Sequence, residues 1–115
     1  MNLLSRIAGG LCLAFFTTQL HAQPLSNADI YFNKLADCIY RAEGGTSTRW
    51  PYGIKIKVKN PRAVCIKVCK DAWSDFCLLG CKGDYLDYLS ECYCPSVDDP
   101  VGNLNWRHNV HALMK

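Results

Sequence analysis

The chain has 115 residues, 50% of them hydrophobic, and 13 Lys and Arg against 10 Asp and Glu give it a formal net charge of +3. This length limits it to one domain, and so mild a positive charge does not indicate nucleic-acid binding. No repeat, linker or low-complexity segment divides the sequence.

The N-terminal segment has the pattern of an export signal. Residues 1–6 form a short charged lead, residues 7–20 are mostly apolar, and Leu20-His21-Ala22 offers a small-residue cleavage site. The apolar run is shorter than the roughly 20 residues that a membrane-spanning helix needs. We therefore expect residues 1–22 to be a cleaved signal peptide and residues 23–115 to form a domain that is exported, periplasmic or secreted, without stable membrane insertion.

The first predicted helix follows a capping box formed by Ser26 and Asp29. Apolar residues then recur at helical spacing, which predicts a buried stripe on about four turns. Gly44 and Gly45 end the helix. The stripe consists of Tyr31, Leu35, Cys38 or Ile39, and Ala42.

Glu43 occupies the last turn of this helix, where the negative end of the helix dipole disfavours a carboxylate. A structural sequence more often places Lys or Arg there. The position therefore has two interpretations, a solvated surface glutamate or a carboxyl group retained for chemistry.

A turn and an alternating segment come next. Trp50-Pro51-Tyr52-Gly53 predicts a turn with two large aromatic rings, which belong either to the core or to a site around Glu43. Residues 54–59 alternate apolar and basic side chains with period two, which predicts a short half-buried strand. Its lysines either discourage strand-to-strand aggregation or form a basic rim toward an anionic ligand.

Three further helices are predicted. Asn60-Pro61 starts one that runs to about Leu79, and Asp84 caps a shorter one that ends before Pro95. After a polar loop at 96–102, residues 103–115 form the terminal helix, with His108 and His111 as solvated or capping residues. The fold class is therefore mainly α, with at most a short β segment near residues 54–59.

Seven cysteines lie beyond the predicted signal peptide, a density that indicates a disulfide-stapled domain. Seven is odd, so at least one thiol is free or forms an intermolecular disulfide, and the pairing stays open. Their spacings differ from those of zinc ligands, so we expect no metal and no cofactor. The disulfide candidates are Cys38, Cys65, Cys69, Cys77, Cys81, Cys92 and Cys94.

Four motifs follow one another along the chain. They are Ile39-Tyr40-Arg41-Ala42-Glu43-Gly44, Pro51-Tyr52-Gly53-Ile54, Tyr93-Cys94-Pro95 and Asn105-Trp106-x-x-Asn109-Val110. In this order they resemble the motifs of small exported lysozyme-like proteins related to soluble lytic transglycosylases. They cover nearly all of the expected mature chain, which carries Gly44 where many of these enzymes have serine.

The resemblance implies a helical lysozyme-like fold and cleavage of the peptidoglycan strand between MurNAc and GlcNAc. It implies that Glu43 is the catalytic acid, that Tyr52, Gly53 and Ile54 line the glycan cleft, and that Tyr93 lies near the acid. Trp106 is expected to support the terminal helix.

Glycoside hydrolysis normally uses two carboxylates, and no other acid here has a companion motif. The sequence therefore favours a single-acid lytic transglycosylase with peptidoglycan as partner, acting as a monomer. The alternative is a non-catalytic, exported cell-wall-binding or inhibitor protein on the same scaffold.

Overall fold

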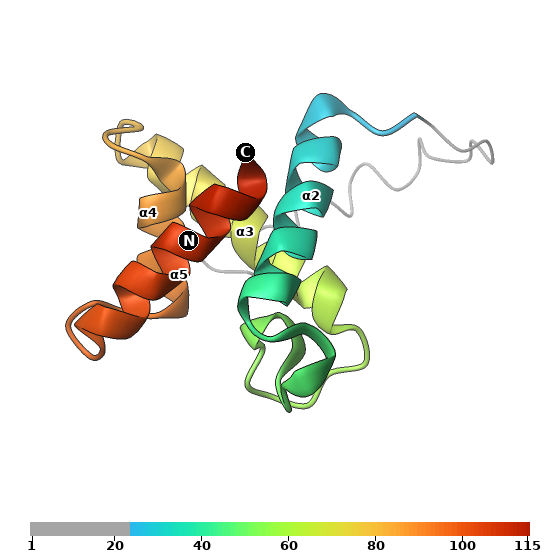
Figure 1. Cartoon of the computed structure of the whole chain (residues 1–115). Coiled ribbons are helices and arrows are strands. Elements are labelled where there is room, and N and C mark those ends of the chain that lie inside the picture. The colour runs from blue at the N-terminus through green and yellow to red at the C-terminus, as the bar shows by residue number, and fades with distance from the viewer. Residues whose placement is uncertain (1–23) are drawn as a thin grey trace.

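The computed structural model describes residues 24–115, so the predicted signal peptide lies outside the described residues. Over that range the chain forms helices joined by turns and no β-strand (Figure 1). The mainly α prediction is confirmed. The elements are α2 (Asn27–Ala42), the 3₁₀ turns η2 (Gly45–Ser47) and η3 (Pro51–Gly53), α3 (Pro61–Leu78), α4 (Tyr85–Tyr93) and α5 (Pro100–Met114).

Side-chain caps set where the helices begin. Ser26 accepts a hydrogen bond from the backbone N–H of the third residue beyond it at 3.1 Å, and Asn60 and Asp84 do the same at 3.0 and 3.1 Å. These three predicted starts are confirmed. The fourth was placed too late, because Asp99 caps α5 and Pro100 occupies its first turn.

The core lies where α2 packs on α3 and α5, with α4 packed against both of those helices. The stripe predicted on α2 is confirmed at Leu35, Cys38 and Ile39, but Tyr31 is 37% exposed and Phe32 takes its place in the core. Further core side chains come from all the other helices. They include Cys65, Cys69, Ala72, Phe76, Tyr85, Leu86, Leu89, Trp106 and Val110.

The strand predicted for residues 54–59 is wrong. This segment is irregular, and Ile56, which the alternation placed inward, is 66% exposed. A strand needs a neighbouring strand to satisfy its backbone groups, and the described part of the chain has no other extended segment to provide one. The alternation therefore marks an exposed loop.

Residues 44–53 fold back along α2 and bring the motif at residues 51–54 against the motif at residues 39–44. The Tyr40 and Tyr52 rings lie 4.9 Å apart between their centroids, and Arg62 donates to the Tyr52 hydroxyl at 3.4 Å. This fold-back returns the chain to the C-terminal end of α2, where Glu43 lies.

None of the helices between residues 24 and 115 has the length and apolarity to cross a membrane. The seven cysteines of this range are free thiols in the structure. The disulfide framework therefore stays a prediction.

Candidate active site

Glu43 is the C-cap of α2, one residue beyond the last helical residue, Ala42. Its backbone N–H donates to the Ile39 carbonyl at 2.9 Å, and the N–H of Gly44 donates to the Arg41 carbonyl at 3.1 Å. Gly44 has φ +107°, which residues with a side chain rarely adopt. The chain's turn after Glu43 is therefore a physical reason for glycine at this position.

A tryptophan from the far end of the chain holds the Glu43 carboxylate. Trp106, only 6% exposed, donates from Nε1–H to Glu43 Oε1 at 2.9 Å. Oε2 accepts no hydrogen bond from the described residues, and none of their fully buried side-chain oxygens is unpaired, so Oε2 is not fully buried. One oxygen is thus fixed and the other is available to a ligand.

Gly53 comes so close to Glu43 that a side chain at this position would crowd the acid. A Cβ built on Gly53 would lie 3.0 Å from Glu43 Cδ and 3.1 Å from Tyr93 Cε1, and its φ of +68° also favours glycine. The glycine of η3 therefore packs its backbone directly against the acid.

Tyr93 closes the other side of the site. Its ring stacks on Trp106, with centroids 5.2 Å apart and planes 20° apart, and its hydroxyl donates to Cys65 Sγ at 3.1 Å. Burial raises the pKa of the Tyr93 phenol, so the ring stays neutral. It supplies an apolar wall beside the carboxylate.

These side chains line a pocket of about 240 Å³ to which four elements contribute. Of the predicted site residues, Glu43, Gly53 and Tyr93 meet there. Ile54 lines a neighbouring pocket of about 270 Å³, and Tyr52 lines neither. The pocket is lined by Ala42, Glu43, Gly53, Lys55, Tyr93, Cys94, Gly102, Asn105, Trp106 and Asn109.

Four lining residues with nitrogen-containing side chains were not predicted to belong to the site. Trp106 was expected only to support α5, whereas it also bonds the acid, and Lys55 was placed on a strand. Asn105 and Asn109 come from the same motif as Trp106 and lie four residues apart. That spacing puts both amides on one face of α5, and it was the signal that could have identified them.

Glu43 is the sole carboxylate among the pocket-lining residues that the structure describes. Three other acids near α4 and α5 have structural partners. Glu91 accepts from the Ser96 N–H at 2.9 Å, while Asp84 and Asp99 cap helices. A second carboxylate suited to activating water is therefore missing from the described pocket lining.

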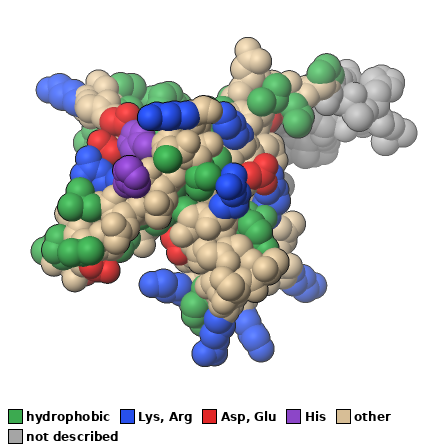
Figure 2. Space-filling model, viewed as in Figure 1, with side chains coloured by type: hydrophobic (Ala, Val, Ile, Leu, Met, Phe, Trp, Pro, Cys, Tyr) green, Lys and Arg blue, Asp and Glu red, His purple; other side chains and the backbone are tan. Residues whose placement is uncertain are grey.

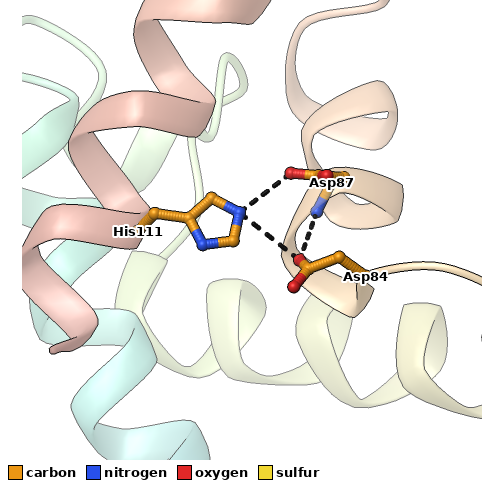
Figure 3. A group of neighbouring side chains, drawn as sticks. All are labelled: Asp84, Asp87 and His111. Atoms are coloured by element: carbon orange, nitrogen blue, oxygen red, sulfur yellow. Dashed lines mark hydrogen bonds and ion pairs between the residues drawn. The ribbon is translucent and has the colours of Figure 1, made fainter.

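A separate cluster joins α4 to α5 (Figure 3). His111 Nε2 lies 2.8 Å from Asp87 Oδ1 and 3.4 Å from Asp84 Oδ1, and these three side chains could offer ligands to a metal ion. Arg107 already donates to both oxygens of Asp87, at 3.0 and 2.8 Å. The cluster is accounted for as an ion-pair network between two helices.

Comparison with protein-family models found no match, and no curated protein or solved structure was found to be similar to this chain.

Proposed function

We propose that this protein cleaves the glycan strand of peptidoglycan between MurNAc and GlcNAc, as a lytic transglycosylase with Glu43 as its single acid. The observation that carries the proposal is the pocket itself. It presents one carboxylate, oriented by the Trp106 N–H and without a hydrogen bond from the described residues at Oε2. The aromatic wall formed by Tyr93 and Trp106 suits the apolar faces of sugar rings.

In the first step, the protonated Glu43 carboxyl transfers its proton to the glycosidic oxygen. The bond between that oxygen and C1 of the muramyl residue breaks, and C1 takes on oxocarbenium character. The carboxylate left on Glu43 accepts the Trp106 hydrogen bond at Oε1, which holds Oε2 toward the reacting atoms. Trp106 is therefore a positioning residue.

In the second step, the Glu43 carboxylate removes the proton from the 6-hydroxyl of the same muramyl residue. The 6-oxygen bonds to C1 and closes a 1,6-anhydro ring, which returns the proton to Glu43 and balances the cycle. This route needs no second carboxylate. It agrees with a pocket whose described lining has only one, whereas water attack normally uses a partner acid.

The proposal also includes a lysozyme-like architecture for the helical scaffold and an exported location. Cysteine thiols form disulfides in such an oxidising environment. Cys77 and Cys81 are one candidate pair, since they flank the C-terminus of α3. The Gly80 and Cys81 N–H groups close that end on the Cys77 and Phe76 carbonyls, both at 3.0 Å. A disulfide there would fix this turn. Intact-mass measurement with and without reduction and alkylation tests it.

The experiment that tests the function is digestion of purified, insoluble peptidoglycan with the purified protein. The supernatant is assayed for released muropeptides, and the pellet for bound protein. Soluble fragments that accumulate with time support an enzyme. Protein bound to the pellet without fragment release supports the cell-wall-binding alternative and overturns the proposal.

A further inference from the structure

Charge is unevenly distributed along this chain. Residues 44–70 contain seven basic side chains and no acid, whereas residues 71–99 contain seven acids and one basic residue, Lys82. The seven basic residues are Arg49, Lys55, Lys57, Lys59, Arg62, Lys67 and Lys70. The seven acids are Asp71, Asp75, Asp84, Asp87, Glu91, Asp98 and Asp99.

The basic residues of α3 are neutralised by partners. Arg62 pairs with Asp37, Lys67 lies 3.8 Å from Asp71, and Lys70 lies 2.9 Å from Asp29. The remaining four belong to residues 49–59, which we term the basic loop. Within residues 24–115 these four, Arg49, Lys55, Lys57 and Lys59, form no ion pair.

The basic loop forms one end of the molecule. Figure 1 shows the segment after α2 at the lower end, and Figure 2 shows Lys and Arg side chains projecting from that end. All four cations of the loop are exposed. Four like charges on a short exposed loop repel one another. A bound anion would reduce this repulsion.

Protection of a strand edge does not explain these lysines. That role needs a sheet edge with unpaired backbone groups, and the described chain has no strand. Lys55 also lines the pocket that holds Glu43 and the pocket beside it. The basic loop therefore continues the pocket rather than occupying an unrelated surface.

We propose that the basic loop docks the carboxylates of the peptidoglycan strand, with Lys55 pairing at the pocket mouth and Arg49, Lys57 and Lys59 pairing further along. This rests on the proposed function, in which the substrate is a glycan whose muramyl residues carry carboxylates on their peptide substituents, or on the lactyl group where no peptide is attached. The loop then selects carboxylate-bearing strands over neutral polymers of the same sugars, such as chitin.

The magnitude expected is moderate and depends on salt. An exposed ion pair changes binding by about two- to fivefold, so losing three together weakens it by roughly tenfold or more. Such pairs weaken as ionic strength rises, because the screening length falls to about 8 Å at 0.15 M. Binding should therefore be tighter at low salt, and this dependence should shrink when the loop is neutralised.

The test is cosedimentation with insoluble peptidoglycan, using Glu43→Gln protein so that no substrate is consumed. The loop variant carries K55Q, K57Q and K59Q. Its matched control carries K67Q, K82Q and K115Q, which remove the same charge elsewhere. Thermal unfolding verifies that both fold. Each protein is measured on native peptidoglycan and on peptidoglycan whose carboxylates have been amidated with carbodiimide and ammonia.

We expect the loop variant to bind native peptidoglycan about tenfold or more weakly and the control to stay within about twofold. Amidation of the peptidoglycan should weaken binding of the Glu43→Gln protein to the level seen for the loop variant on native peptidoglycan. Equal losses in the two triple variants, or unchanged binding to amidated material, would overturn the proposal. Tighter binding to phosphatidylglycerol vesicles than to peptidoglycan would also overturn it, by assigning the loop to a membrane.

Failure of the docking proposal can be distinguished from failure of the proposed function. If Glu43→Gln digests peptidoglycan as fast as the unmodified chain, the assignment of the acid fails while the binding difference stands. If the acid is confirmed and the two triple variants bind alike, the docking proposal alone fails.

Discussion

The two ends of this helix bundle differ in whether their charged side chains form ion pairs. At the junction of α4 and α5, Asp87 pairs with both Arg107 and His111, and His111 also lies 3.4 Å from Asp84. Figure 3 shows His111 between the two aspartates. At the other end the four cations of the basic loop form no ion pair within the described residues, and Lys55 lines the same pocket as the Glu43 carboxylate. Paired charges stabilise a fold, whereas unpaired charges around a pocket remain available to a ligand.

The largest loss of activity is expected from substitution of Glu43. Glu43→Gln keeps the size of the side chain but cannot deliver a proton, so peptidoglycan cleavage should fall by about 10²- to 10⁴-fold, the usual range for a general acid. The matched control is Glu91→Gln, which alters a carboxylate outside the pocket. Near-normal turnover by Glu43→Gln, with circular dichroism unchanged, is incompatible with the assignment.

Gly53→Ala should act on stability and on activity together. It forces a side chain at φ +68° and places Cβ 3.0 Å from Glu43 Cδ, so we expect about 1–2 kcal/mol of destabilisation and at least a tenfold loss of activity. Gly83→Ala is the control, because Gly83 has φ +85° with nothing within 4 Å. Urea unfolding and digestion rates measure both. If the two variants lose activity equally, the contact with Glu43 has no role.

Trp106→Phe should have an intermediate effect. It retains a ring to stack on Tyr93 but removes the N–H that bonds Glu43 Oε1 at 2.9 Å. A hydrogen bond to a charged group contributes about 1.5–3 kcal/mol, so kcat/KM should fall by roughly 10- to 100-fold. Tyr93→Phe is the comparison, since it removes a hydroxyl that bonds Cys65 instead of the acid. Equal kcat/KM for both variants would argue against a positioning role.

The smallest effect is expected at the junction of α4 and α5, where Asp87 forms ion pairs, and it is an effect on stability. The hydrogen bond from Arg107, then that from His111, holds the pKa of Asp87 below its ordinary value of 3.8. A carboxylate with a depressed folded-state pKa stabilises the fold above its unfolded-state pKa, and this stabilisation is lost as pH falls through the folded value.

Asp87→Asn should therefore lower stability at neutral pH, by less than about 1 kcal/mol because the pair is partly exposed, and make unfolding less sensitive to acid below about pH 4. Urea midpoints from pH 2 to pH 7 measure it. The activity of this variant at pH 7 should stay near normal, which separates the junction of α4 and α5 from the site. An unchanged acid dependence would show that the network carries no stability.

Local signals explain what was predictable from the sequence. Ser26, Asn60 and Asp84 cap helices through bonds to residues three positions away, so their effect is visible in a short stretch. The Glu43 position was also local, since the two glycines after it define the helix end. The strand predicted from the alternation of residues 54–59 was wrong, because an alternating segment forms a strand only where a partner strand exists.

The contacts that assemble the site depend on tertiary packing. The Trp106 bond to Glu43 spans 63 residues, and the approach of Gly53 to Tyr93 depends on how the fold-back meets α4. No spacing rule encodes these distances. The order of the motifs indicated that they belong together, but only the packing of α5 against α2 revealed which nitrogen holds the acid.

Mass spectrometry of the fragments released from peptidoglycan tests the single-acid mechanism most directly. Because Glu43 is the one carboxylate of the described pocket lining, new muramyl ends should carry the 1,6-anhydro ring. Muramyl residues with reducing ends would mean that water attacks C1, with a second group activating it. That result would contradict the single-acid mechanism on which this reading of the site rests.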